Sequence, residues 1–268
     1  MTKPYEWNGT DYQQYSRYQT EQGIELLGLL NIRNGERILD AGCGNGLLTV
    51  RIAKENPEGS VLGIDLSEGM LSKAEENKKK HDIANVVFQL KNTVSIDYEN
   101  EFDALFSNSA LHWIKDHKLL LNKFYKALKP GGRLVLGFAS KGNVDSFLKV
   151  LEYVINNSKD FRYYFKDFEF PWYFPGKEYD RLIKNAGFQK CNITFKAVDF
   201  AVTEEELEGW FRTVGMPFWN FLPKPLSDRF FNTVISEYLK KMHGEEIVLT
   251  FKRLIVHAVK PVNFMQPA

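Results

Sequence analysis

The first 140 residues alternate between short apolar runs and stretches with helical periodicity. The apolar runs predict five strands, at residues 37–41, 61–65, 86–90, 102–107 and 133–138. The periodic stretches predict helices at residues 47–55, 68–80 (with Ser67 as N-cap) and 117–128. Residues 129–132, Lys-Pro-Gly-Gly, predict a turn before the fifth strand. Strands and helices alternating in this way indicate right-handed βαβ units and a parallel sheet covered on both faces.

The pattern changes after residue 140. Residues 143–186 are expected to be helical apart from an aromatic loop at 168–176, and residues 189–200 and 247–259 alternate like strands. The segment between these two strands predicts three helices, at residues 203–213, 217–222 and 225–243. We therefore expect a core formed by residues 1–140, 187–202 and 245–262. A helical cap, residues 141–186 and 203–244, would be inserted between its last two strands.

The amino-acid composition excludes several classes of protein. The formal net charge is +1, which argues against a protein that binds nucleic-acid phosphates. Neither the two cysteines nor the N-terminal segment indicates a secreted protein, and no apolar stretch is long enough to cross a membrane, so we expect a cytoplasmic protein. Aromatic residues make up 14% of the chain and concentrate after residue 150. This enrichment predicts an enclosed, partly apolar pocket in the cap.

A glycine-rich loop follows the first strand, with Gly42, Gly44 and Gly46 at alternate positions. Asp65 ends the second strand, where an acidic side chain can accept hydrogen bonds from both ribose hydroxyls of an adenosine. The spacing differs from the dinucleotide fingerprint, whose third glycine comes three residues after the second. Asp40 before the loop would repel a pyrophosphate but could pair with an ammonium group. A nucleoside joined to an amino acid is therefore implied, and S-adenosylmethionine is such a ligand.

Four ordered segments resemble the class I S-adenosylmethionine-dependent methyltransferases, at residues 38–46 (ILDAGCGNG), 61–71 (VLGIDLSEGML), 102–113 (FDALFSNSALHW) and 128–136 (LKPGGRLVL). Later segments, at residues 171–188, 205–215 and 247–261, are similar to the trans-aconitate methyltransferase group. Similarity to malonyl-carrier-protein and juvenile-hormone-acid methyltransferases is looser. The relatives in these groups esterify carboxylates.

The resemblance implies a doubly wound, Rossmann-like α/β fold. Its seven-stranded sheet would have the order 3-2-1-4-5-7-6 with the last strand antiparallel, and the helical cap would lie between the last two strands. It also implies that Asp65 holds the ribose, that Leu66 and Met70 enclose the adenine, and that Asn108 lies beneath the methionine. The remaining expected cofactor contacts are Asp40, Ala41, Gly42, Cys43, Gly44, Asn92, Thr93 and Gln19.

The substrate side of the expected site is carried by aromatic and polar residues. His112 either orients a substrate carboxylate or acts as a base, or else is a structural histidine. Gln19 approaches the cofactor or the substrate, and Arg212 is the candidate cation for an anionic substrate, unless it is a solvated helix residue. The candidate pocket walls are Trp113, Trp172, Tyr173, Trp210 and Trp219.

These features predict methyl transfer from S-adenosylmethionine to a carboxylate oxygen of a small molecule, by in-line displacement, with S-adenosylhomocysteine as the second product. The alternatives are N-methylation or phenolic O-methylation of another small molecule, and a protein that binds the cofactor without transferring its methyl group. No metal site is expected, because the histidines and carboxylates show no ligand spacing. We expect no nucleic-acid or membrane partner, and a monomer or a weak homodimer.

Overall fold

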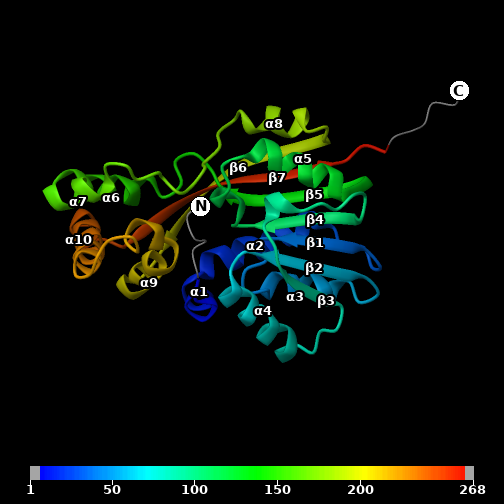
Figure 1. Ribbon diagram of the computed structural model, residues 1–268, viewed down its shortest axis with the longest axis horizontal. Helices are drawn as coiled ribbons and strands as arrows, with labels where there is room; N and C mark the ends of the chain where they lie inside the picture. Colours follow the sequence, from blue (N-terminus) through cyan, green and yellow to red (C-terminus); the bar gives the residue numbers. More distant parts are fainter. Residues whose placement is uncertain (1–6, 263–268) are drawn as a thin grey trace, which may run out of the picture.

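The computed structural model describes residues 7–262, and within them seven strands form one sheet (Figure 1). The strand order is β3-β2-β1-β4-β5-β7-β6, and β7 runs antiparallel to both neighbours. Both features confirm the fold expected from the sequence. The strands are β1 (Arg37–Ala41), β2 (Ser60–Asp65), β3 (Val86–Leu90), β4 (Phe102–Asn108), β5 (Leu128–Ala139), β6 (Gln189–Ala201) and β7 (Val248–Val259).

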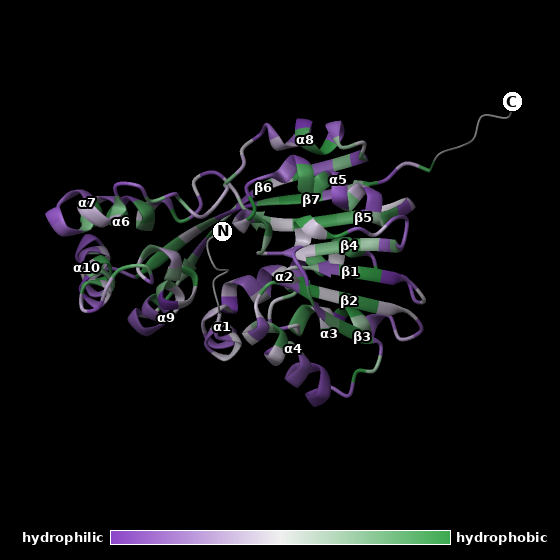
Figure 2. Cartoon of the chain, viewed as in Figure 1, coloured by the Kyte–Doolittle hydropathy of each residue, from purple (hydrophilic) through white to green (hydrophobic). Residues whose placement is uncertain are grey.

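Alternate residues of the central strands face two different helical layers. On β1, Ile38 packs with α2 (Arg17–Leu30) and α3 (Leu47–Glu55), whereas its neighbour Leu39 packs with α5 (His117–Ala127) and α8 (Tyr179–Asn185). Near-continuous apolar strands of this kind are typical of a parallel sheet covered on both faces, as Figure 2 shows. Next to β3, α4 (Glu68–Lys80) begins at the predicted cap, where Ser67 accepts a hydrogen bond from the Met70 N–H.

A separate helical layer lies beyond one end of the sheet (Figure 1). β5 pairs with β7 only as far as Arg253, and the stretch of β7 before this residue continues alone with β6. This two-stranded extension leads to the layer, whose core contains Phe147, Trp210 and Phe230. The elements of the layer are α6 (Asp145–Asn156), α7 (Lys159–Phe165), α9 (Glu204–Val214), η3 (Met216–Phe218) and α10 (Leu226–Lys241), and α1 (Gly9–Tyr15) packs on α9 and α4.

Two segments differ from the expectation. The turn predicted at residues 129–132 is part of β5, where a register shift and the positive φ of Gly131 form a bulge. This segment stays in the sheet because Gly131 and Gly132 exchange backbone hydrogen bonds with Lys260 at 2.8 and 2.9 Å. The second segment is α8, which falls in the range assigned to the cap but packs on the sheet, with Tyr179 and Ile183 fully buried there.

A buried ion pair ties β5 to the start of β1. Arg133 and Glu36 are 7% and 9% exposed, and the guanidinium binds both carboxylate oxygens at 2.8 and 2.6 Å. Its Nε donates to the carbonyl oxygen of Leu30 at the end of α2. The pair therefore joins three elements at the edge of the sheet opposite the loops described below. Among residues 7–262, no helix is long and apolar enough to span a membrane.

Candidate functional site

The glycine loop lies at the carboxyl ends of the central strands, where doubly wound sheets bind their ligands. Gly42 and Gly44 have positive φ angles of 77° and 53°, a conformation that favours glycine. A Cβ atom at Gly42 would lie 2.3 Å from the Cβ of Ala110, whereas one at Gly44 would meet nothing within 4 Å. Gly44 thus leaves open space on the cavity side, and Gly42 allows the loop to approach the segment after β4.

Asp65 is held at the edge of this loop by backbone donors. Its Oδ2 accepts a hydrogen bond from the N–H of Gly44 at 2.9 Å, and its Oδ1 accepts one from the N–H of Ser67 at 3.0 Å. A carboxylate oxygen can accept more than one hydrogen bond, so an anchored carboxylate can still accept from a ligand. The sequence-predicted residues Leu66, Met70, Asn92 and Thr93 line the same cavity. We call this part, together with Gly42, Gly44 and Asp65, the glycine-loop end.

Three predicted loop residues lie beneath the cavity surface and do not line it. Asp40 is 2% exposed, and its Oδ2 accepts a hydrogen bond from the Thr49 hydroxyl at 2.6 Å. Burial raises the pKa of Asp40 to about 7, although the Thr49 hydrogen bond acts in the opposite direction. Ala41 is fully buried, and burial raises the pKa of the Cys43 thiol well above its usual value. These residues therefore support the loop from below.

Asn92 has a role that differs in part from the expectation. It precedes the short helix η1 (Thr93–Ser95), and its Oδ1 accepts a hydrogen bond from the Val94 N–H at 3.0 Å. Asn92 was expected to contact the cofactor, and an amide oxygen can accept a hydrogen bond from an adenine amino group. The hydrogen bond from the Val94 N–H uses one lone pair of Oδ1, and the second lone pair stays available for the adenine amino group.

The end of β4 is joined to both α2 and β7 through Asn108. Its Nδ2 donates to the Gln19 carbonyl oxygen at 3.0 Å, and its Oδ1 accepts from the Arg253 Nη2 at 2.7 Å. Asn108, Gln19 and Arg253 all line the cavity. The sequence reasoning placed Gln19 and Asn108 here but missed Arg253. The available signal was a cation in phase with Leu249 and Phe251 on an alternating strand.

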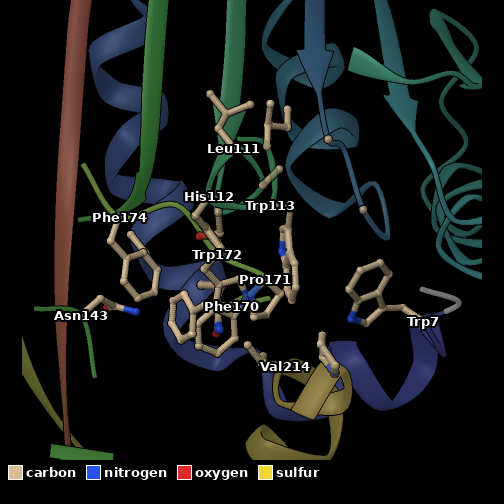
Figure 3. A pocket seen from close by; sticks show the side chains of 18 of the residues that line it. Trp7, Leu111, His112, Trp113, Asn143, Phe170, Pro171, Trp172, Phe174 and Val214 are labelled. Carbon is tan, nitrogen blue, oxygen red and sulfur yellow. The ribbon is translucent and has the colours of Figure 1, made fainter. Parts of the chain in front are cut away.

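The same cavity continues into the helical layer and has a volume of about 1170 Å³. Figure 3 shows Trp113, Phe170, Trp172 and Phe174 gathered around it. Trp172 stacks on Phe174 with ring centroids 5.6 Å apart and meets the edge of Trp113 at 5.7 Å. We call this part the aromatic wall, which consists of Trp113, Phe168, Phe170, Trp172, Phe174, Trp210, Phe221 and Phe251.

His112 lies between the two ends of the cavity, in η2 (Leu111–Trp113) directly after β4. Burial, together with the positive charge of Arg253, lowers the pKa of His112 to about 3. The imidazole is therefore neutral at physiological pH. Its backbone carbonyl accepts a hydrogen bond from Tyr173 at 2.7 Å, which fixes the aromatic loop against the end of the sheet.

Three residues predicted for the substrate side lie outside the cavity lining. Arg212 is exposed, and its guanidinium lies over the Phe231 ring, 4.3 Å from the centroid. Tyr173 packs on His117, and Trp219 packs on Phe231 within the helical layer. Arg212 therefore does not line the cavity, whereas Arg253 does. No group of three or more metal-ligating side chains occurs within residues 7–262.

Residues 32–168 match the family model described as "Methyltransferase domain". The chain belongs to this family. A trans-aconitate 2-methyltransferase from Deinococcus radiodurans is 33% identical over 130 residues, which cover 48% of each protein. A 27-O-demethylrifamycin SV methyltransferase from Amycolatopsis mediterranei is 36% identical over 114 residues, 42% of each protein. The chain thus spans about half the length of the curated relatives that it matches.

A solved structure of the same fold is that of Haemonchus contortus phosphoethanolamine N-methyltransferase 2 in complex with S-adenosyl-L-methionine. Its TM-score is 0.58 at 24% sequence identity, covering 90% of this chain and 52% of that protein. The similarity extends beyond residues 32–168, so most of this chain shares the fold of that structure.

Proposed function

We propose that this chain transfers the methyl group of S-adenosylmethionine to a carboxylate oxygen of a small molecule. The observation that carries the proposal is one continuous cavity lined by both the glycine-loop end and the aromatic wall. A cofactor at the first and an acceptor at the second would meet near His112, where the proximity of the two reactants is itself a large part of catalysis.

The residues at the glycine-loop end fit the cofactor. Gly44 leaves room for a ligand against the backbone, and the anchored Asp65 can accept hydrogen bonds from ribose hydroxyls. Leu66 and Met70 supply apolar contacts for the adenine, with Asn92 and Thr93 at its edge. When bound, S-adenosylmethionine supplies an activated methyl group. The chain would align this methyl group with the acceptor and exclude water.

The protonation state of His112 favours a carboxylate acceptor. A carboxylate is already ionised at neutral pH and needs no base to become a nucleophile. A phenol or an ammonium group must first lose a proton, and an imidazole with a pKa of about 3 is a weak acceptor for that proton. The neutral ring can instead donate a hydrogen bond that orients the carboxylate.

A hydroxyl acceptor is the second candidate. It is supported by the name of the Amycolatopsis mediterranei relative, a methyltransferase for an O-demethylated rifamycin. The two candidates predict different products, because a methyl ester is cleaved by mild base and a methyl ether is not.

The test is methyl transfer by the whole chain from methyl-labelled S-adenosylmethionine to a panel of carboxylic acids, phenols and amines. Calorimetry first measures whether the cofactor binds. We expect binding and label in base-labile products from the acids. Label confined to base-stable products would support the second candidate, and cofactor binding without turnover over the whole panel would contradict both.

A further inference from the structure

Arg253 is a buried cation without a counter-charge. It is 3% exposed, and among residues 7–262 neither its Nε nor its Nη1 has a hydrogen-bond partner. Glu25, whose charge acts on Arg253, is itself paired with Lys196 at 2.6 Å. The Tyr18 hydroxyl lies beside the guanidinium without the geometry of a hydrogen bond, and it supplies no counter-charge because burial raises the pKa of Tyr18 to about 12. An unpaired buried charge is costly, so an arrangement of this kind indicates a site for an anion.

Arg253 lies where the two ends of the cavity meet. It follows Phe251 by two residues on the same face of β7, and Phe251 belongs to the aromatic wall. In the other direction, its Nη2 reaches Asn108 at the end of β4. Its charge also acts on His112, the residue between the two ends. The acceptor oxygen must come to this junction in order to reach a methyl group held at the glycine-loop end.

We infer that Arg253 binds the carboxylate of the acceptor, and that the acceptor is a monocarboxylic acid with an extended apolar body. The inference rests on the proposed function and names its substrate class. Nη2 carries two protons and donates one of them to Asn108, so its second proton can form a fork with the free N–H of Nε or of Nη1. Such a fork matches the two oxygens of one carboxylate and fixes the direction in which the acid enters.

The charges around the cavity disfavour an acceptor with several carboxylates. The other lining cation, Lys115, donates its ammonium protons to the carbonyl oxygens of Phe170 and Trp172 and so fastens the aromatic loop. Asp167 and Glu169 line the cavity on the same loop. Trans-aconitate carries three carboxyl groups. Besides Arg253, the lining within residues 7–262 offers only the Lys115 ammonium, which the two carbonyl oxygens already hold, so the further carboxylates would meet these acidic side chains.

The aromatic wall, together with Tyr164, offers the apolar surface on which the extended body of the acid would lie. Tyr164, Phe170 and Phe221 line the cavity and are still 40%, 40% and 45% exposed. Apolar surface thus continues from the junction to the solvent-exposed part of the lining. An alkyl or aryl chain lying along this surface would bury it, and each methylene buried would add to the affinity of the acid.

The first test compares acids as acceptors for the wild-type chain. We expect kcat/KM for decanoate or 4-phenylbutanoate to exceed the values for trans-aconitate and propanoate by about 100-fold, because several methylenes or a ring are buried. Decanamide, which keeps the body but lacks the charge, is expected to bind at least about 10-fold more weakly than decanoate. A preference for trans-aconitate or equal affinity for decanamide would overturn the inference.

The second test replaces the guanidinium. Calorimetry measures decanoate binding to chains saturated with S-adenosylhomocysteine, for wild type, Arg253→Met, Arg253→Lys and the control Lys252→Met. Lys252 is the exposed neighbour on the opposite side of the same strand. We expect Arg253→Met to weaken decanoate binding by about 10- to 100-fold, Arg253→Lys to lie between it and wild type, and Lys252→Met to match wild type.

The same samples distinguish the alternatives for Arg253. If Arg253→Met weakens S-adenosylhomocysteine binding and leaves decanoate binding unchanged, the guanidinium holds the amino-acid end of the cofactor and the inference is wrong. Failure of wild type to bind or use S-adenosylmethionine would instead contradict the proposed function itself. Far-UV circular dichroism establishes that each variant is folded before its affinity is compared.

Discussion

Tyr179 donates its hydroxyl proton to Nδ1 of His117 across 2.7 Å. The direction follows from the other side of the ring, where Nε2 lies 3.0 Å from the Leu111 carbonyl oxygen, which can only accept. His117 is therefore a neutral imidazole with its proton on Nε2. The bond joins the start of α5 to the start of α8 and fastens both to the segment that carries His112.

The neutral His117 makes stability depend on pH. Burial lowers the pKa of His117 to about 4, from about 6.5 in the unfolded chain, so the unfolded chain takes up a proton first as the pH falls. The stabilisation is present above pH ~6.5 and is lost as the pH falls toward ~4. We expect the free energy of unfolding to fall between pH 7.0 and pH 5.5, and to fall by about 1 kcal/mol less in His117→Gln than in wild type. Urea unfolding at the two pH values measures this difference.

Two other groups do not affect this comparison. Burial raises the pKa of Asp40 and lowers that of His112, and both contributions are the same in wild type and variant. An unchanged pH dependence in His117→Gln would show that His117 is not the group that titrates.

Asp65 should be the main polar determinant of cofactor affinity. Asp65→Ala removes the acceptor for ribose hydroxyls and also releases the N–H groups of Gly44 and Ser67. We expect S-adenosylmethionine affinity, measured by calorimetry, to fall by about 100-fold or more. Asp97→Ala, which removes an exposed carboxylate paired with Lys91, should leave it unchanged. Equal affinity of Asp65→Ala and wild type would remove Asp65 from the site.

Because Gly42 lies close to Ala110, adding one methyl group at Gly42 should lower the free energy of unfolding. In Gly42→Ala the new Cβ would meet Ala110, and the backbone would also keep a left-handed conformation. We expect a loss of more than about 1 kcal/mol in unfolding free energy, together with weakened cofactor binding. Gly28→Ala should instead gain about 0.5–1 kcal/mol, because Gly28 is exposed within α2 and its Cβ would meet nothing. Chemical denaturation of the two variants measures whether the unfolding free energy falls in Gly42→Ala and rises in Gly28→Ala.

The buried pair of Arg133 and Glu36 should be sensitive to loss of one partner. Glu36→Ala leaves a buried guanidinium without its carboxylate, and the expected loss of stability is about 3–5 kcal/mol. The exposed pair of Asp145 and Lys149 is the control, since Asp145→Ala should cost less than about 0.5 kcal/mol. A loss below 1 kcal/mol for Glu36→Ala would mean that solvent reaches Arg133 after the substitution.

The α/β half was predictable because its signals are local. The helix over residues 47–55 and the Ser67 cap were read correctly, since periodicity and capping depend only on nearby residues. The segment at 129–132 could not be read in this way. Lys-Pro-Gly-Gly is a sound turn signal, but its backbone pairs with Lys260, about 130 residues further along the chain. Only this distant partner makes it part of a strand.

The candidate site was predictable to the extent that motifs carry it. The glycine loop and Asp65 lie where the spacing placed them. Arg212 illustrates what spacing alone can miss, because two residues of a helix are separated by about 200°. Since Trp210 faces the cavity, Arg212 must point away from it. Arg253 was missed because its charge was not compared with the phase of its strand, in which Leu249 and Phe251 place it on the buried face.

The two-stranded extension of β6 and β7 separates the chain into parts that can vary independently. Residues 202–247, with α9, η3 and α10, can change length, composition or shape without disturbing the strands of the glycine-loop end, because this segment leaves and rejoins the sheet through the ribbon alone, whereas α6 and α7 leave from β5 and return through α8. Phe251 and Arg253 are exceptions, because they contribute to the cavity and belong to a sheet strand. Acceptor preference can therefore diversify among related chains by exchange of whole inserted segments, whereas changes at these two positions are constrained by the stability of the sheet.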